Sequence, residues 1–240
     1  MPFTPTERRR YNSQPRFATL RVTLRAGKSY SSPVTTEAII PHTVSGLQRK
    51  TSPALAELIS AVRHVVQSET GPEKVGLAVA ELLQPCLSAT DLLTAEQLKP
   101  CGETYRQHIL HVEPDGSFSV VALVWLPGQA TPIHDHVSWC VVGVHRGAEH
   151  ETVYELAGAQ SDPHLRVTGH AINAVGSVAA LVPPGDIHHV ENAGEGLAVS
   201  LHIYGADIGA LGSSIRRRYD LEVRSPAHQV AGIAGASPAW

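Results

Sequence analysis

The residues from Gly128 to Gly147 read GQATPIHDHVSWCVVGVHRG, and this stretch decides how the fold is interpreted. It places His134 and His136 two positions apart, just before a valine-rich segment of the kind that favours a β-strand. Side chains two positions apart on a strand point to the same face of the sheet. Both imidazoles can therefore point at one ion, and neutral imidazole is a ligand for iron, zinc, copper and nickel.

A second histidine-containing stretch, residues 176–192, reads GSVAALVPPGDIHHVEN. An apolar run over residues 178–182 ends in a Pro-Pro-Gly turn, and the pair His188 and His189 follows it. A single buried histidine is more often a hydrogen-bonded core residue than a metal ligand. Two histidine stretches that follow one another in this order favour a metal site instead.

Together the two stretches resemble the paired metal-binding motifs of the cupin superfamily. In the first, a glycine is followed after five residues by HDH, after three more by Cys140 and after six more by a second glycine. Most cupins carry a metal-binding glutamate where Cys140 stands. In the second motif, the spacing after Pro-Pro-Gly matches His188, and not His189, to the third metal ligand. The gap between Gly176 and this turn is one residue longer than in the usual cupin pattern. The resemblance implies a mainly β fold, the jelly-roll β-barrel of the cupins.

Helices are expected before the barrel. Ser52 and Pro53 are residue types favoured at the N-cap and the first helical position, and apolar residues then recur at helical spacing as far as Val66. A second helix is expected over residues 73–83, ended by Pro85, and a third short one from residue 88 or 94 to 98, ended by Pro100. These helices are predicted to form one α-helical layer packed against the barrel.

Short β-strands are predicted for the rest of the chain, because apolar, β-branched runs alternate with turn signals from residue 103 onward. The expected strands cover residues 105–112, 118–125, 138–144, 151–156, 165–167, 171–175, 178–182 and 197–204. Many short strands at such spacing are typical of an antiparallel barrel or jelly roll.

Three segments are distinguished along the chain: residues 1–50, 51–225 and 226–240. Residues 1–50 hold nine Lys/Arg and two Glu, about +7, whereas the rest holds ten basic and twenty acidic residues, about −10. We expect residues 1–50 to be a basic, disordered extension; an organellar transit peptide or a nucleic-acid arm is an alternative, the latter without a supporting motif. Residues 51–225 are the expected cupin domain, and residues 226–240 a tail.

The cysteines number three, without CxxC spacing, which argues against a disulfide framework and for a reducing, cytoplasmic location. No apolar run reaches the length of about eighteen residues that a transmembrane helix requires. We expect neither a nucleic-acid nor a membrane partner. The oligomeric state stays open between a monomer and a small homo-oligomer.

A third polar pattern lies in residues 200–204, SLHIY. On a strand, Ser200, His202 and Tyr204 share one face, and the apolar residues between them take the other. A polar face on a buried strand is costly unless its groups are hydrogen-bonded. A Ser–His–Tyr hydrogen-bond relay at the metal pocket would meet that requirement; the alternative is a strand face turned to solvent.

These residues carry a closer resemblance. The sequences HDH, a following cysteine, IHHVEN and SLHIY are similar to those of the cysteine dioxygenase family of thiol dioxygenases, over roughly residues 52–204. The resemblance implies an iron(II) ion held by His134, His136 and His188, and oxidation of a small thiol to its sulfinic acid by O₂. It also implies that the relay formed by Ser200, His202 and Tyr204 is catalytic.

Cys140 stands where the mammalian-type enzymes have a cysteine that crosslinks to the relay tyrosine. The loop from His136 to Cys140 is one residue shorter than theirs, so the crosslink is left open.

The first barrel strand bears on the choice of substrate. Mammalian-type enzymes bind the substrate carboxylate there with an arginine, whereas this chain reads Tyr105-Arg106-Gln107-His108. It therefore resembles the bacterial glutamine-type branch, some of whose members prefer 3-mercaptopropionate. Gln107 and Tyr105 are the candidate substrate-binding residues. Arg106 lies on the opposite strand face, and an arginine from residues 216–218 is an alternative carboxylate partner.

The sequence thus predicts an iron(II) thiol dioxygenase that acts on 3-mercaptopropionate or L-cysteine. Two other functions stay open: a cupin metalloenzyme of different chemistry, such as a non-thiol dioxygenase or an isomerase, and a metal-bound small-molecule sensor. The relay and Cys140 favour the thiol dioxygenase, because neither alternative has an evident need of them.

Overall fold

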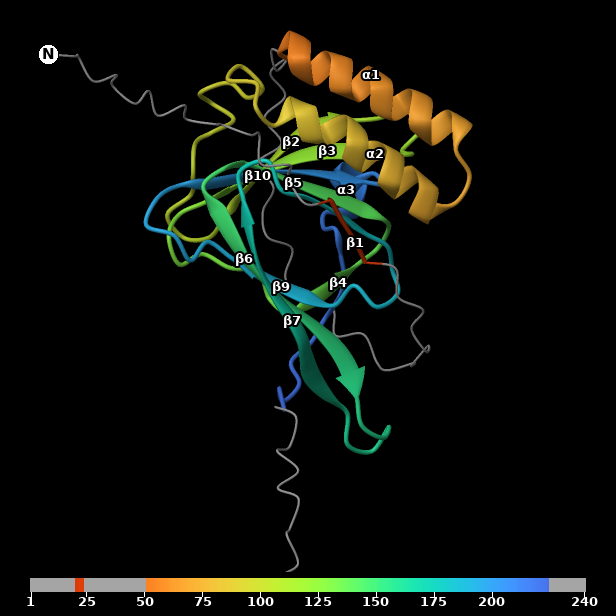
Figure 1. Ribbon diagram of the computed structural model, residues 1–240, viewed down its shortest axis with the longest axis vertical. Coiled ribbons are helices and arrows are strands. Elements are labelled where there is room, and N and C mark those ends of the chain that lie inside the picture. The colour runs from red at the N-terminus through yellow and green to blue at the C-terminus, as the bar shows by residue number, and fades with distance from the viewer. Residues whose placement is uncertain (1–19, 24–50, 225–240) are drawn as a thin grey trace, which may run out of the picture.

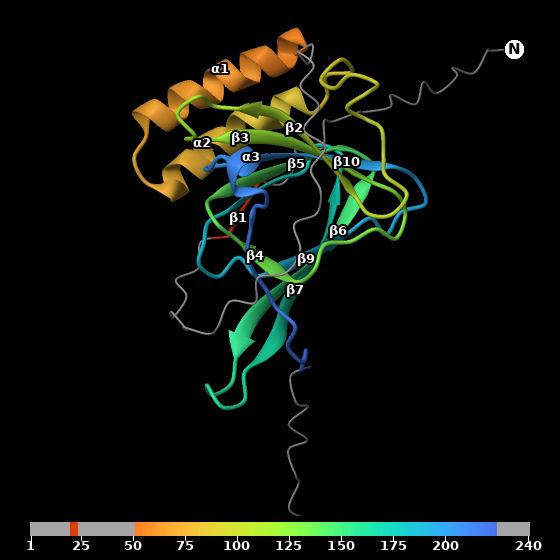
Figure 2. The ribbon, with the colours of Figure 1, turned by 180° about the vertical axis from the view of Figure 1, so that it is seen from behind.

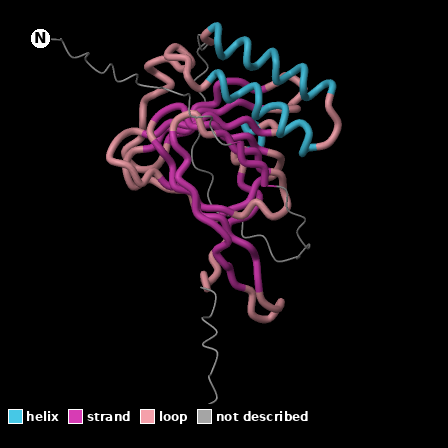
Figure 3. Tube along the Cα trace, in the orientation of Figure 1, coloured by secondary structure: helices cyan, strands magenta, loops and turns pink. Residues whose placement is uncertain are grey.

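The structure, a computed structural model, describes residues 20–23 and 51–224, whose strands form two sheets closed around a common interior (Figure 3). The six-stranded sheet has the order β1 (Leu20–Thr23), β8 (Val178–Leu181), β5 (Cys140–Arg146), β10 (Ala198–Tyr204), β3 (Ser119–Trp125), β2 (Arg106–Val112). The five-stranded sheet has the order β11 (Ile215–Arg218), β4 (His134–His136), β9 (His188–Glu191), β6 (Ala148–Ala157), β7 (His164–Ala174). All strand pairs are antiparallel except β1 with β8. The predicted mainly β, antiparallel barrel is confirmed.

The predicted helical layer is confirmed as well, since α1 (Pro53–Ser68) and α2 (Pro72–Cys86) lie side by side against the six-stranded sheet (Figure 1). Ser52 caps α1: its hydroxyl accepts a hydrogen bond from the Leu55 amide at 3.1 Å. One apolar face of each helix is buried in a cluster shared with β3, β5, β8 and β10. A third, four-residue helix, α3 (Ile208–Leu211), follows β10. Seen from behind, the β6–β7 hairpin extends away from the helices (Figure 2).

Strand β10 is the central element that separates two cores. All seven of its residues are buried because it pairs with β3 on one side and β5 on the other. Its apolar residues Val199, Leu201 and Ile203 join the cluster under the helices. The alternating residues therefore face the barrel interior, where Tyr204 packs in a second cluster. The predicted division of this strand into an apolar and a polar face is what the structure shows.

Two helix predictions were wrong in detail. Helix α2 does not end before Pro85 but includes it in the last turn, where a missing amide costs one hydrogen bond at an exposed position. Residues 88–98 form turns rather than a third helix. Thr94 and Gln97 do make reciprocal capping bonds of 2.9 and 3.3 Å. Only one helical turn fits between the cap at Thr94 and Pro100. The ring of Pro100 disfavours helical backbone at the preceding residue, so the turn does not continue as a helix.

The predicted strands also needed corrections. The segments expected at 165–167 and 171–175 are one long strand, β7, and the short strands β9 and β11 were not predicted. Within the segment expected to be a basic extension, Leu20–Thr23 form β1, which pairs with β8. The other residues of that extension, and the tail from residue 225, lie outside the described residues. None of the described helices combines the length and the apolar character that a membrane span requires.

Gly143 on β5 lets α2 pack closely against the barrel. A Cβ atom at this position would lie 2.8 Å from a methyl carbon of Leu83 and 2.9 Å from one of Leu87, both of which are buried. Gly143→Ala is therefore expected to lower the free energy of unfolding by about 1–3 kcal/mol through overpacking. Gly169→Ala is the control, because a Cβ there meets nothing within 4 Å. Urea denaturation measures both; equal stability of the two variants would contradict this packing argument.

Candidate metal centre and hydrogen-bond relay

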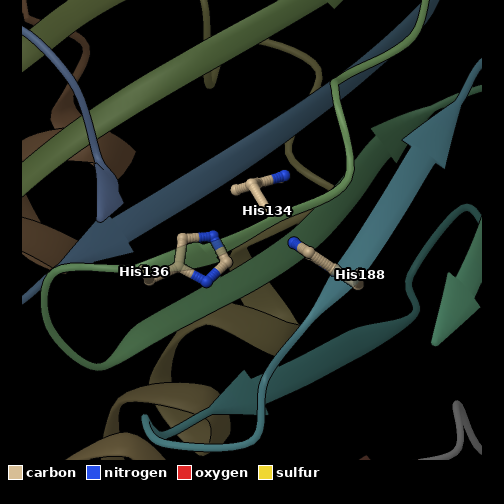
Figure 4. A group of neighbouring side chains, drawn as sticks. All are labelled: His134, His136 and His188. Atoms are coloured by element: carbon tan, nitrogen blue, oxygen red, sulfur yellow. The ribbon is translucent and has the colours of Figure 1, made fainter. Parts of the chain in front are cut away.

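The three histidines predicted as ligands meet inside the barrel (Figure 4). His134 and His136 lie on β4, and His188 on β9 is the direct cross-strand partner of His134. One ring nitrogen of each lies within 4.8 Å of those of the other two. All three side chains are buried. The next residue, His189, is half-buried, pairs with Thr152 and is not part of the group, as strand alternation predicts.

Each of the three rings is held at its Nδ1 atom. His134 Nδ1 lies 2.9 Å from the Pro132 carbonyl oxygen. His136 Nδ1 lies 2.9 Å from a carboxylate oxygen of Asp186, and His188 Nδ1 lies 2.8 Å from one of Glu151. A neutral imidazole that donates through Nδ1 keeps its lone pair on Nε2. Hydrogen bonds of this kind orient metal-ligating histidines and raise their basicity.

The Nε2 atoms are left for a metal ion. His188 Nε2 is buried without a hydrogen-bond partner among the described residues. Burial lowers the pKa of His134 well below its usual value, with further lowering by the two other histidines, and burial also lowers the pKa of His136. The rings are therefore neutral. A buried nitrogen lone pair without a partner, as at His188 Nε2, is costly, and a divalent ion bound by all three rings removes that cost. The residues present fit a metal ion.

Strand β10 supplies a hydrogen-bonded chain beside the histidines, as predicted. Ser200 Oγ lies 2.9 Å from His202 Nε2, and His202 Nδ1 lies 3.0 Å from the Tyr204 hydroxyl. Burial, followed by the nearby ligand histidines, lowers the pKa of His202 to about 3, so this ring is neutral. Burial also raises the pKa of Tyr204 well above its usual value. The chain ends close to the metal ligands, since the Tyr204 and His136 ring centroids are 6.1 Å apart.

Cys140 and Tyr204 are neighbours. They are cross-strand partners in the β5–β10 pair and pack in the same interior cluster. Burial raises the pKa of the Cys140 thiol well above its usual value, helped by Asp186, although the Tyr204 side chain opposes the shift. The thiol is thus protonated at neutral pH and does not belong to the group of potential ligands. The predicted proximity of Cys140 and Tyr204 is present in the structure.

A cavity of about 380 Å³, its mouth included, opens beside the histidines. Both candidate substrate-binding residues line it: Gln107, and Tyr105, whose ring stacks on that of Trp125 at 4.5 Å. Its other lining residues include the three histidines, His202 and Tyr204. No arginine or lysine of the described residues lines the cavity. Arg216, one of the alternative carboxylate partners, pairs with Asp135 instead.

Three acidic residues near the site were not predicted: Glu149, Glu151 and Asp186. Glu151 and Asp186 hold two of the ligand histidines. Asp186 stands two positions before His188, and Glu149 and Glu151 share one face of a strand, so weak local signals existed. The partners of Glu149 and Glu151 lie on β9 and β10, many residues away along the chain, and no local pattern indicates those contacts.

The fold and the site define a metal-binding cupin barrel. Residues 87–211, just over half of the chain, match the family described as cysteine dioxygenase type I, and the chain belongs to this family. It is thereby placed among dioxygenase-type enzymes that bind metal.

Solved structures of other proteins resemble this chain over about half of its length. The protein TT1209 from Thermus thermophilus is 21% identical, with a TM-score of 0.36, over 49% of this chain and 98% of that protein. A cupin 2 conserved barrel domain protein from Salinispora arenicola is 18% identical, with a TM-score of 0.34, over 49% and 89%. Recombinant oxalate oxidase in complex with glycolate is 18% identical, with a TM-score of 0.36, over 50% and 62%.

Replacement of His188 by Ala is expected to abolish metal binding, because two of the three convergent nitrogens do not hold a divalent ion against water. His189→Ala is the matched control and is expected to retain most of the binding, since this ring lies outside the group. Metal content after dialysis, and calorimetric titration of the metal-free protein, measure the difference. Loss of binding in the His189 variant with retention in the His188 variant would contradict the ligand assignment.

Proposed function

We propose that this protein is an iron(II)-dependent thiol dioxygenase of the glutamine-type branch, which oxidises a small thiol carboxylate to its sulfinic acid with O₂. The observation that carries the proposal is the combination of three convergent histidines, with no carboxylate in their group, and the Ser200–His202–Tyr204 chain at the same cavity. Neither a sensor nor an isomerase has an evident need of that chain. The three free cysteines favour a reducing, cytoplasmic setting.

The donor set explains why a thiol carboxylate suits the site. Neutral His134, His136 and His188 would hold the ion through Nε2 and leave its charge uncompensated, so the site favours anionic groups. Bound iron(II) would supply the Lewis acidity that converts a thiol, whose free pKa is about 8.5, into a thiolate, and the redox chemistry with dioxygen. Three protein ligands in an octahedral field leave about three open positions for substrate and dioxygen together.

The side chains of this chain then bind and orient the substrate. Burial keeps the Cys140 thiol protonated, so it does not compete with the substrate thiolate. His202 accepts or donates a hydrogen bond at the Tyr204 hydroxyl and so fixes its direction, and Tyr204 lines the cavity in which the substrate would lie. The stacked rings of Tyr105 and Trp125 form an apolar wall, and Gln107 offers a neutral amide to the substrate carboxylate.

The amide of Gln107 predicts which thiol is preferred. It cannot form the charged, bidentate pair that an arginine makes with a carboxylate. The loss of that pair weakens discrimination in favour of L-cysteine by on the order of 1–3 kcal/mol, and it relaxes the need for an amino group on the substrate. We therefore expect a higher kcat/KM for 3-mercaptopropionate than for L-cysteine.

Oxygen consumption by the iron(II)-loaded protein, measured with both thiols at equal pH and metal content, tests this expectation. Arg106→Gln is the matched control: it changes the adjacent side chain, which does not line the cavity, and should leave the ratio of the two kcat/KM values unchanged. A clear preference for L-cysteine would refute the glutamine argument. Turnover of neither thiol would refute the thiol dioxygenase and leave the other cupin chemistries.

The contact between Cys140 and Tyr204 predicts a thioether crosslink that forms during turnover. Cys140 is the cross-strand partner of Tyr204 and lies in the same buried cluster, so no large movement is needed to join them. Intact mass after turnover is expected to fall by two hydrogens, and Cys140→Ser is expected to show no such change. A wild-type mass that stays constant through many turnovers would contradict the crosslink.

A further inference from the structure

A second cavity, of about 390 Å³ with its mouth included, lies next to the metal cavity and shares three lining residues with it, His188, Val190 and His202. It has room for water. Its titratable lining groups are Glu149 and Glu151 from β6, His188 from β9 and His202 from β10. The residues that β5, β7 and β8 contribute to it carry no charge. The hydrogen-bonded chain on β10 thus runs between two cavities.

Glu149 is the group of this second cavity that the proposed chemistry does not yet use. Its side chain is 1% exposed, and its Oε1 atom has no hydrogen-bond partner among the described residues. Burial raises the pKa of the Glu149 carboxyl to about 7, and the nearby charge of Glu151 also raises it. Hydrogen bonds from the Ser200 and Trp125 side chains, together with the electrostatic effect of His188, lower this pKa. The carboxyl is therefore a neighbour of Ser200, the outer end of the chain that leads through His202 to Tyr204.

The hydrogen-bonding capacity of Ser200 couples Glu149 to His202. A hydroxyl donates one hydrogen bond and accepts two. The Trp125 indole N–H can only donate, and it is shared between Ser200 Oγ, at 3.3 Å, and the Glu149 side chain, so it supplies no acceptor to Ser200. One donated and one accepted bond remain for Glu149 and His202. Whichever of these two receives the Ser200 proton, the other must donate to Ser200.

Two arrangements follow. When Glu149 is ionised, it accepts from Ser200, His202 donates through Nε2, and His202 Nδ1 accepts the Tyr204 hydroxyl proton. When Glu149 is protonated, it donates to Ser200, Ser200 donates to His202 Nε2, and His202 Nδ1–H donates to Tyr204. In this second arrangement the Tyr204 proton is released from His202, and it can point to a group in the metal cavity, which Ser214 also lines, or to the neighbouring Cys140.

We propose that Glu149 is the outer end of the relay, that it takes a proton from water in the second cavity, and that its protonation determines whether Tyr204 can donate into the metal cavity. In one concerted transfer, Glu149 gives its proton to Ser200, and Ser200 gives its own proton to His202 Nε2. His202 then passes its Nδ1 proton to Tyr204, and Tyr204 passes its hydroxyl proton to an oxygen of the substrate. Glu149 loses one proton, the substrate gains one, and every group between them ends with the number it had.

Glu149 is thus a positioning residue that acts through Ser200 and His202. The proposal deepens the proposed function, and it rests on that function only for the identity of the final acceptor.

The position of the proton on His202 tests the proposal without turnover. In the full chain with ¹⁵N-labelled histidine, the His202 signals, identified by their loss in His202→Gln, report which ring nitrogen carries the proton. We expect the proton on Nδ1 below about pH 7 and on Nε2 above it. In Glu149→Gln the tautomer should not change with pH, because this side chain does not titrate. Ser177→Ala, at the wall of the same cavity and outside the relay, should behave as wild type.

Kinetics of the iron-loaded protein give the second readout. In wild type, kcat should fall as the pH rises through about 7, because ionised Glu149 turns the Tyr204 proton away from the cavity. In Glu149→Gln this dependence should disappear and kcat should be lower by on the order of 100-fold, while KM changes little because Glu149 does not line the metal cavity. Absence of any thiol turnover would refute the proposed function, yet the tautomer experiment would still decide the role of Glu149.

A His202 tautomer that is the same below and above pH 7 in wild type would overturn the proposal. So would a transition that persists unchanged in Glu149→Gln.

Discussion

The burial of three neutral imidazoles at one point is the constraint on which the rest of the structure depends. The pairing of β4 with β9 sets His134 opposite His188, and strand alternation brings His136 to the same face. Each Nδ1 atom is bound to a carbonyl or carboxylate oxygen, which turns Nε2 inward. Without a metal ion, this arrangement leaves the buried Nε2 lone pair of His188 without a partner among the described residues. The barrel interior is therefore suited to an ion held by nitrogen ligands.

The position of β10 between β3 and β5 explains why a chain of polar side chains lies beside the three histidines. Its apolar residues are buried under α1 and α2, so its polar residues must face the barrel interior and satisfy one another there. The resulting chain of neutral groups ends at Tyr204 beside the ligands and reaches Glu149 at its other end. One strand thus closes the helical core on one side and connects two cavities on the other.

Local periodicity and motif spacing predicted those parts of the site that lie on single strands. The spacing of HDH, the selection of His188 over His189 and the alternation of Ser200, His202 and Tyr204 all follow from the two-residue period of a strand. What was missed depends on contacts between distant segments, because Glu149 and Glu151 reach β10 and β9 only in the folded chain.

The errors in the fold have the same origin. The amphipathic pattern predicted both long helices correctly. Local propensity alone, however, wrongly predicted that α2 ends before Pro85 and that residues 88–98 contain a third helix. Leu20–Thr23 carry no periodic signal of their own and become a strand by pairing with β8.

The measurement that tests the central claim most directly is product analysis of the iron(II)-loaded protein turning over 3-mercaptopropionate under ¹⁸O₂. A sulfinic acid that carries two labelled oxygen atoms is the predicted result, and a product without label, or the disulfide alone, would contradict it.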